Sequence, residues 1–428
     1  MSNRLEQARE QARELDRGDP LSGFRAQFWI PNKADGGAQL YFCGNSLGLQ
    51  PRGVASAVEE ELSAWRELGV EGHFKGKRPW ISYNDLLRVP MAELVGAQAQ
   101  EVVVMNTLTV NLHLMMISFY QPRGQRRQIL IEEQSFPSDR HAVESQIRMH
   151  GLDPAECLVE IPPSRDDRNI NETAIENYLA ENGERVALVL WPGVQYATGQ
   201  FFDLERIVSA AHGAGALCGF DLAHAVGNVP LNLHNCGVDF AVWCTYKYLN
   251  SGMGAVAGCF VSQRHGGRQD LPRLHGWWGN DPASRFKMQP GFTPANGADA
   301  WQLSNPPILS MAPIRVSLQI FQQAGMAALR KKSVEMTAWL EQLIQAELGD
   351  AIEIITPSDP GRRGCQLSLR VSAGRTAGRN LFERLEAAGT IPDWREPDVI
   401  RLAPVPLYNR FEDCWQFVNQ VRGYLGEP

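Results

Sequence analysis

The chain has no long hydrophobic run, and its first twenty residues form a charged amphipathic helix pattern instead of a signal peptide. It also has no excess of positive charge, since 41 Lys and Arg stand against 48 Asp and Glu, a net charge of −7. A nucleic-acid surface needs clustered basic residues, so neither a membrane span nor nucleic-acid binding is expected. We expect a cytoplasmic protein that acts on a small molecule.

The sequence also lacks the cysteine patterns that bind metals. Its eight cysteines include no CxxC pair and no cluster with the His spacing of a zinc site. Cys218 and Cys259 lie within apolar runs, where a free thiol packs as a small hydrophobic group. We therefore predict reduced, structural cysteines and no metal site.

The length of 428 residues exceeds the usual size of one hydrophobic core, and 44% hydrophobic residues suit a globular enzyme. No repeat or low-complexity tract is present. We predict an N-terminal helical segment over residues 1–40, a large domain over 41–315 and a small C-terminal domain over 316–428.

Short β-branched runs alternate with helical patterns between residues 100 and 262, which is typical of an α/β fold with a mostly parallel sheet. A loop-rich stretch follows at 263–310, and a long helical pattern at 313–348 then leads to a smaller α/β unit. Seven strands of one large sheet are predicted at 101–105, 128–132, 157–161, 186–191, 216–220, 240–244 and 255–261. The smaller unit is predicted to have strands at 352–355, 365–371 and 399–403 and helices at 378–388 and 410–424.

Lys247 lies in the run DFAVWCTYKYL, directly after a predicted strand and before the turn NSGMG. A lysine at the mouth of a sheet can form a Schiff base with pyridoxal phosphate (PLP) if its amine is desolvated. A solvated lysine at a strand end would give the same local pattern. Lys247 alone therefore does not distinguish a PLP-binding lysine from a solvated one, and other residues are needed.

Asp221 ends an earlier predicted strand, GALCGFD, at the sheet edge where ligands of open α/β sheets bind. An aspartate there can pair with the pyridinium nitrogen of PLP and keep it protonated, so that the cofactor accepts electrons. Asp221 could equally cap the following helix. The order strand, Asp, strand, Lys is more specific than either residue alone.

Two turns upstream supply other parts of a cofactor site. Leu108 and Thr109 open a predicted helix whose free N–H groups could hold a phosphate, although the turn lacks the usual glycines. Phe136 and Asp139 follow another strand and would bring an aromatic face and a carboxylate to the same pocket. A hydrophobic staple with a helix cap would also explain that second turn.

From about residue 41 to 424 the sequence closely resembles the kynureninase family, whose members have the PLP-dependent transferase-like fold type I of aspartate aminotransferase. The segments that carry the resemblance are YFCGNSLGLQP, GHFKGKRPW, NTLTVNLHLMM, SFPSDRHA, GVQYATGQ, DLAHAVGN, TYKYLN, GWWG, SNPPIL and RLAPVPLYN.

The resemblance implies that Lys247 binds PLP covalently and that Arg401 holds the substrate α-carboxylate, for which its planar fork is suited. It implies a homodimer with active sites at the subunit interface, to which the partner contributes the loop with Trp277 and Asn305. The further cofactor contacts that it implies are Leu108, Thr109, Phe136, Asp139, Asp221, His224 and Tyr246, and a further substrate contact is Asn45. One departure is Pro192, where some relatives carry a small hydroxyl residue.

The reaction implied is the hydrolysis of an L-kynurenine-type amino acid to L-alanine and an anthranilate, in tryptophan breakdown toward quinolinate and NAD. Lys247 would remove the α-proton, and Tyr246 would donate a proton or else only contact the phosphate. His73 and Asn305 match positions that face the aryl ring. Because polar groups suit a hydroxylated ring, we predict a preference for 3-hydroxy-L-kynurenine.

Two other readings stay open. A cysteine desulfurase or selenocysteine lyase would need a catalytic cysteine on a mobile loop, for which Cys365 is the candidate. A non-catalytic protein could also have kept the fold.

Overall fold

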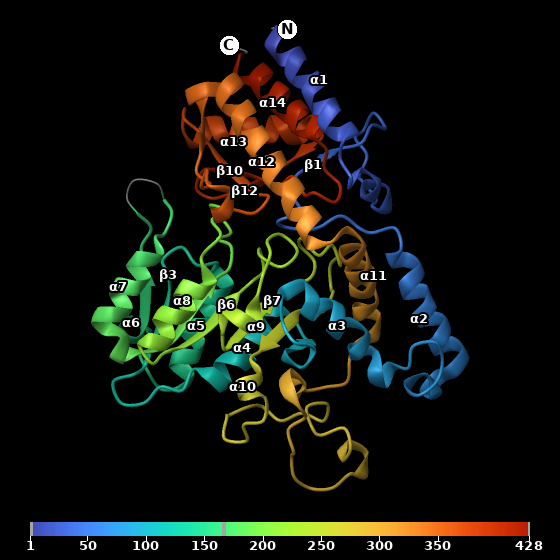
Figure 1. Ribbon diagram of the computed structural model, residues 1–428, viewed down its shortest axis with the longest axis vertical. Helices are drawn as coiled ribbons and strands as arrows, with labels where there is room; N and C mark the ends of the chain where they lie inside the picture. The colour runs from blue at the N-terminus through green and yellow to red at the C-terminus, as the bar shows by residue number, and fades with distance from the viewer. Residues whose placement is uncertain (1–2, 165–167, 427–428) are drawn as a thin grey trace.

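The computed structural model describes residues 3–164 and 168–426, which form a large lower body and a smaller upper body (Figure 1). The large body contains a seven-stranded sheet with the order β2-β8-β7-β6-β5-β3-β4. Only β8 runs antiparallel to its neighbours, so the predicted mostly parallel sheet is confirmed. The strands are β2 (Val102–Val104), β3 (Gln128–Glu132), β4 (Leu158–Ile161), β5 (Val186–Pro192), β6 (Leu217–Asp221), β7 (Phe240–Trp243) and β8 (Gly258–Val261).

Helices cover both faces of this sheet because its strands are apolar on both sides. In β3, Leu130 packs toward one face, whereas Ile129 and Ile131 pack toward the other, as the alternation of a strand requires. The first face is covered by α7 (Glu172–Asn182) and α8 (Leu204–Gly213), and the second by α4 (Leu108–Phe119) and α5 (Pro137–Met149). Short helices are α6 (Pro154–Cys157), α9 (Leu233–Cys236) and α10 (Gln263–Gly266).

A group of three helices flanks the large sheet on the right of Figure 1. These are α2 (Val54–Leu68), α3 (Tyr83–Val95) and α11 (Ile308–Ala324). Between α10 and α11 the chain forms long loops with short 3-10 turns, which extend at the bottom of the view. The loop-rich stretch predicted from the sequence is therefore confirmed.

The small body is a four-stranded antiparallel sheet with the order β12-β13-β10-β9. Helix α1 packs on α14, and Leu5 and Ala12 of α1 belong to the core of this body. Its strands are β9 (Ile352–Ile354), β10 (Leu367–Val371), β12 (Asp393–Arg395) and β13 (Val399–Leu402), and its helices are α1 (Asn3–Arg17), α12 (Met326–Leu348), α13 (Arg375–Ala387) and α14 (Phe411–Leu425). A two-stranded parallel sheet pairs β1 (Leu40–Tyr41) with β11 (Thr390–Ile391).

The long helix predicted at 313–348 is wrong in one respect, because Gly325 divides it into α11 and α12. Gly325 has a φ of 73°, a left-handed value that suits glycine and ends the first helix. Helix α11 packs in the large body and α12 in the small one. The predicted domain limits stay a prediction, and this packing supports a boundary at Gly325 instead of 315. None of the helices within 3–164 and 168–426 has the length and apolarity to cross a membrane.

Candidate active site

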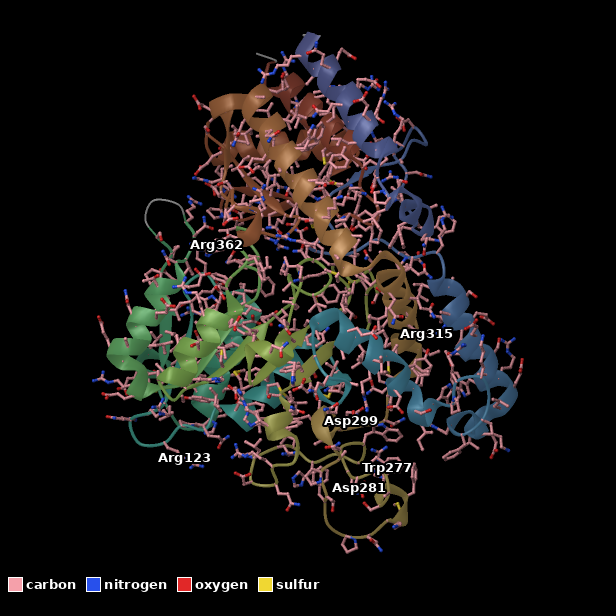
Figure 2. All side chains as sticks on the ribbon, in the orientation of Figure 1. Arg123, Trp277, Asp281, Asp299, Arg315 and Arg362 are labelled. Carbon is pink, nitrogen blue, oxygen red and sulfur yellow. The ribbon has the colours of Figure 1, made fainter. Side chains whose placement is uncertain are left out.

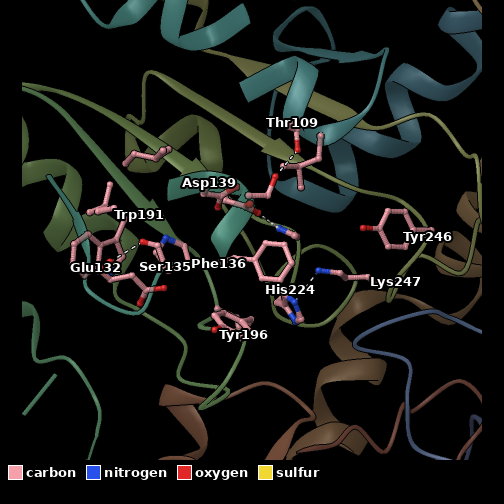
Figure 3. A pocket seen from close by; sticks show the side chains of 18 residues that line it. Thr109, Glu132, Ser135, Phe136, Asp139, Trp191, Tyr196, His224, Tyr246 and Lys247 are labelled. Carbon is pink, nitrogen blue, oxygen red and sulfur yellow. Dashed lines mark hydrogen bonds between the residues drawn. The ribbon is translucent and has the colours of Figure 1, made fainter. Parts of the chain in front are cut away.

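A cleft lies where β3, β5 and β6 end, beside the loop that follows β7 (Figure 3). This is the carboxyl edge of the parallel strands, where open α/β sheets bind ligands. The predicted site residues that line it are Leu108, Thr109, Phe136, Asp139, Asp221, His224, Tyr246 and Lys247.

Lys247 lies on a loop that the N-terminal part of the chain fixes in place. The backbone N–H of Gly48 donates to the carbonyl of Tyr246 at 2.8 Å. A Cβ atom at Gly48 would lie 2.3 Å from the Lys247 carbonyl oxygen, so only glycine allows this approach. The lysine Nζ points into the cleft, 5.8 Å from the ring centroid of Phe136.

His224 is the direct partner of this lysine, with its Nε2 2.8 Å from Lys247 Nζ. Burial, together with the nearby positive charges of Lys247 and Arg401, holds the pKa of His224 well below its ordinary value. The imidazole is therefore neutral at physiological pH, and Nε2 can accept a hydrogen bond from the lysine amine.

Asp139 and Asp221 form a close carboxyl pair on the other side of the cleft. Burial and the neighbouring Asp221 raise the pKa of Asp139 well above its ordinary value. Asp221 accepts a hydrogen bond from the Ala223 N–H at 2.7 Å, but this contact lies in a turn, since the next helix begins only at Leu233, so the helix-cap alternative is wrong. Asp139 Oδ1 is buried and has no hydrogen-bond partner within the described ranges. The pair therefore fits a cationic N–H group.

Glu132, the last residue of β3, is a third acid in the cleft. Burial, with a further contribution from Asp221, raises the pKa of Glu132 to about 8. Its Oε1 accepts from the Gln195 amide at 3.4 Å, and its Oε2 has no partner among the residues described. Glu132 is therefore protonated at neutral pH in the cofactor-free chain.

The starts of α4 and α5 meet at one end of the cleft. Thr109 and Ser138 lie in the first turns of these helices, with their hydroxyl oxygens 3.0 Å apart. Asn106, which precedes α4, has a φ of 52° and so adopts the left-handed conformation. Asparagine tolerates this conformation, and it takes the place of the glycine that this turn lacks. Free N–H groups and hydroxyls at two helix N-termini suit a phosphate.

These groups together fit PLP. Phe136 offers an aromatic face and is held edge-on by Tyr196 at a centroid distance of 5.3 Å. The acidic pair suits a protonated ring nitrogen, the helix starts suit a phosphate, and Lys247 can bind an aldehyde.

Arg401 and Asn45, the predicted substrate contacts, lie next to the cleft. Both are linked to the backbone carbonyl of Tyr196, Arg401 directly and Asn45 through Gln366. Arg401 Nη1 donates to the Tyr196 carbonyl at 2.7 Å. Asn45 donates to Gln366 at 2.8 Å, and Gln366 in turn donates to the same Tyr196 carbonyl at 3.1 Å. The structure thus joins the two predicted residues across the domain boundary.

Comparisons with known proteins agree with this geometry. Residues 329–421 match the family model of the kynureninase C-terminal domain. The chain is 59% identical to the kynureninase of Stenotrophomonas maltophilia (strain K279a), over 98% of this chain and 99% of that one. It is also 59% identical to the kynureninase of Xanthomonas euvesicatoria pv. vesicatoria (strain 85-10), over 97% and 98%.

The chain belongs to the kynureninase family. The resemblance inferred from the sequence is therefore confirmed. Its fold is similar to that of the cysteine desulfurase CsdA from Escherichia coli, with a TM-score of 0.74, 17% identity and coverage of 95% of this chain and 98% of that one. The predicted fold class is confirmed as well.

Three residues that the kynureninase resemblance singled out do not line this chain's own cleft. His73 packs edge-on against Trp80 at a centroid distance of 5.3 Å. Trp277 donates to the Arg285 carbonyl at 3.1 Å and lies in the loops at the end of the molecule opposite the small body (Figure 2). Asn305 is exposed. Their roles stay predictions.

Sequence reasoning missed Glu132, Ser138 and Tyr196, all of which line the cleft. Each was within reach, because Glu132 ends a predicted strand, Ser138 follows Phe136 by two residues and Tyr196 lies in the family segment GVQYATGQ. Pro192 lines the cleft without a hydroxyl group, and the hydroxyls nearest in sequence to Phe136 that line it belong to Ser135 and Ser138.

Cys365, the candidate nucleophile of the rival reading, is 1% exposed. Its N–H donates to Asn228 at 2.9 Å, and burial raises the pKa of its thiol to about 12. A nucleophilic cysteine needs a thiolate on an accessible loop, so Cys365 does not have the required setting.

Proposed function

We propose that this chain hydrolyses L-kynurenine-type amino acids between Cβ and the aryl-ketone carbon, giving L-alanine and an anthranilate. It would then be a hydrolase of carbon–carbon bonds with PLP as its cofactor. The observation that carries the proposal is the cleft itself, in which one lysine, a neutral histidine and a carboxyl pair with an unpartnered Asp139 oxygen among the described residues lie beside an aromatic ring.

We assign the cofactor contacts as follows. Lys247 would bind the PLP aldehyde, Phe136 would face its ring, and Asp221 and Asp139 would hold its ring nitrogen. Leu108 and Thr109 would hold its phosphate at the start of α4, with Tyr246 beside it. When bound, PLP supplies an electron-accepting ring for the bond that breaks.

Two residues beside the cofactor would move protons. Neutral His224 accepts a hydrogen bond from Lys247 Nζ and so keeps the amine directed into the cleft. Once free of the cofactor, Lys247 would take the α-proton of the substrate. Burial, with Cys244 adding to the effect, raises the pKa of Tyr246, so its hydroxyl stays protonated and able to donate.

Arg401 and Asn45 would bind the amino-acid end of the substrate. Arg401 is buried next to the cleft, where its Nη1 donates to the backbone carbonyl of the cleft-lining residue Tyr196 at 2.7 Å. A guanidinium can hold a carboxylate through two parallel hydrogen bonds. Asn45 Oδ1 is buried without a partner in the described chain, and it could accept from the substrate ammonium group.

We further propose a homodimer in which the partner subunit completes the cleft. The loops with Trp277 and Asn305 lie away from this chain's own cleft and expose large apolar side chains. Phe286 and Met288 are exposed in the same loops, where a partner could cover them. His73 and Asn305 would then face the aryl ring and favour 3-hydroxy-L-kynurenine. All eight cysteines are free thiols, which supports a cytoplasmic location.

The proposal is tested with purified protein, PLP and both kynurenines, following anthranilate fluorescence and the visible band of the bound cofactor. We expect turnover of both substrates, with the higher kcat/KM on the 3-hydroxy form. Lys247→Ala should lower turnover by at least about 10³-fold and change the visible band.

Unchanged turnover and an unchanged band in Lys247→Ala would contradict the catalytic assignment. A higher kcat/KM on L-kynurenine would contradict only the substrate preference. Sulfide release from cysteine, without anthranilate formation, would favour a desulfurase instead.

A further inference from the structure

The strand β12 places an acid directly opposite Arg401. In the antiparallel pair β12–β13, Asp393 is the cross-strand partner of Arg401. Directly opposed side chains in such a pair lie on the same face, about 5 Å apart at Cβ. Asp393 Oδ2 accepts from Arg401 Nη2 at 2.6 Å, and the two side chains are 8% and 1% exposed. The contact is therefore a short, desolvated ion pair.

We propose that Asp393 is a positioning residue for substrate binding, which fixes the guanidinium of Arg401 in the plane that meets the substrate carboxylate. The proposal rests on the proposed function, in which Arg401 binds that carboxylate.

The guanidinium is held from two sides that belong to different domains. Asp393 binds Nη2 from the small body, and the Tyr196 carbonyl accepts from Nη1 at 2.7 Å from the large body. Two fixed contacts on different nitrogens define the plane of the group. Because a guanidinium has five N–H donors, three are left, and the Nε–H has no partner within the described ranges. The remaining donors are those a carboxylate can use.

The charges of the cluster also leave room for an anion. Arg395 lies two residues from Asp393 on the same strand, hence on the same face, and its Nε lies 3.2 Å from Asp393 Oδ1. Two guanidinium groups thus share one carboxylate, with a net charge of +1. A bound substrate carboxylate would neutralise this remaining charge in a buried place, where an unpaired charge is costly.

Tyr196 links this anchor to the cofactor pocket. Its carbonyl accepts from Arg401, while its ring packs edge-on against Phe136. A guanidinium held by both Asp393 and Tyr196 is therefore fixed relative to Phe136 in the wall of the cofactor pocket. Small errors in such alignment are costly, since a displacement of about 1 Å can lower a rate about 10²-fold.

The test compares Asp393→Asn and Asp393→Glu with a matched control, Asp398→Asn. Asp398 belongs to another ion pair of the small body, with Arg370 Nη2 2.6 Å from its Oδ2. The readouts are kcat and KM for kynurenine, equilibrium binding of L-alanine followed by the visible cofactor band, and inhibition by a kynurenine analogue that lacks the α-carboxylate.

We expect Asp393→Asn to raise KM and the Kd of L-alanine about tenfold or more, with kcat changed less than about threefold. Inhibition by the analogue without a carboxylate should not change. Asp393→Glu should restore part of the L-alanine affinity, and Asp398→Asn should behave as wild type.

An unchanged or lower KM in Asp393→Asn would overturn the proposal, and so would equal weakening of both ligands. Loss of stability in Asp393→Asn without selective loss of the carboxylate ligand would also overturn it, because a structural role predicts that result. If the wild-type chain forms no anthranilate, the proposed function fails, and this inference fails with it. Failure of Asp393→Asn alone leaves the proposed function intact.

Discussion

Two aspartates with buried carboxyl oxygens, at opposite edges of the large sheet, have opposite surroundings. Asp239, before β7, lies at the amino edge and accepts hydrogen bonds from His212 at 2.9 Å, His265 at 2.7 Å and Arg264 at 2.6 Å. Although burial alone would raise it, the hydrogen bonds from the two histidines bring the pKa of Asp239 below its ordinary range. Asp139, at the carboxyl edge, has an unpartnered oxygen among the described residues and a raised pKa.

The contrast between Asp239 and Asp139 distinguishes a structural acid from a candidate functional one, and it does not depend on related sequences. A buried acid whose oxygens are all paired stabilises the fold, whereas an unsatisfied acid that also lines a cleft is a candidate contact for a ligand. In this chain the satisfied acid lies at the edge of the sheet away from the cleft, and the unsatisfied acids Asp139 and Glu132 line it.

The largest effect should come from Asp239→Asn. This change removes the buried carboxylate that accepts hydrogen bonds from Arg264, His212 and His265, and breaking such a buried ion pair costs about 3–5 kcal/mol. We expect a lower free energy of unfolding in urea, with kcat of the folded fraction close to wild type. A loss of kcat at full stability would break the comparison.

Asp139→Asn should show the reverse pattern. Asp139 Oδ1 has no hydrogen-bond partner among the described residues. Asp139→Asn should therefore not lower the free energy of unfolding of the protein measured without PLP. Activity should fall about 10²-fold, since a group that holds the cofactor ring is weakened. Unfolding curves without PLP and turnover with PLP measure the two quantities, and a destabilised cofactor-free variant would refute the assignment.

The smallest effect, when it is compared over a single pH unit, is the pH dependence of stability that Glu132→Gln should remove. Folded Glu132 keeps its proton to about pH 8, while the unfolded chain releases it near pH 4.5. Ionisation of the unfolded chain therefore lowers stability as pH rises between these values, by at most about 1.4 kcal/mol per pH unit. Urea unfolding of the cofactor-free protein at several pH values should give a flatter profile for the variant. Parallel profiles would mean that Glu132 is ionised in the fold.

Much of the large sheet could be predicted because its strands are continuous apolar runs bounded by turns. The run that leads into Lys247 is an example, and β7 indeed ends four residues before this lysine. In contrast, β12 has only three residues and follows a proline, so nothing local marks it. Its pairing with β13 is a tertiary contact, and Asp393 was missed with it.

The candidate site could be predicted in part for the same kind of reason. Asp221 and Lys247 follow strong strand patterns, and they line one cleft as expected. Glu132 also ends a strand, but a sequence does not show that its carboxyl is fully buried. The predicted roles of Trp277 and Asn305 could not be tested in a single chain, because both residues are expected to contribute to the cleft of a partner subunit.

Because α1 packs against α14, the core of the small domain is built from two segments that lie far apart in the sequence. Residues such as Leu5 are synthesised before the large domain, whereas their core partners, including Trp415, are synthesised after it. During synthesis α1 therefore has no packing partner until α14 has been made, whereas the large domain between them can already fold. The domain that carries Arg401 would therefore close only after α14 is made, so a chain that lacks α14 should keep the cofactor cleft while Arg401 loses the packed domain that holds it.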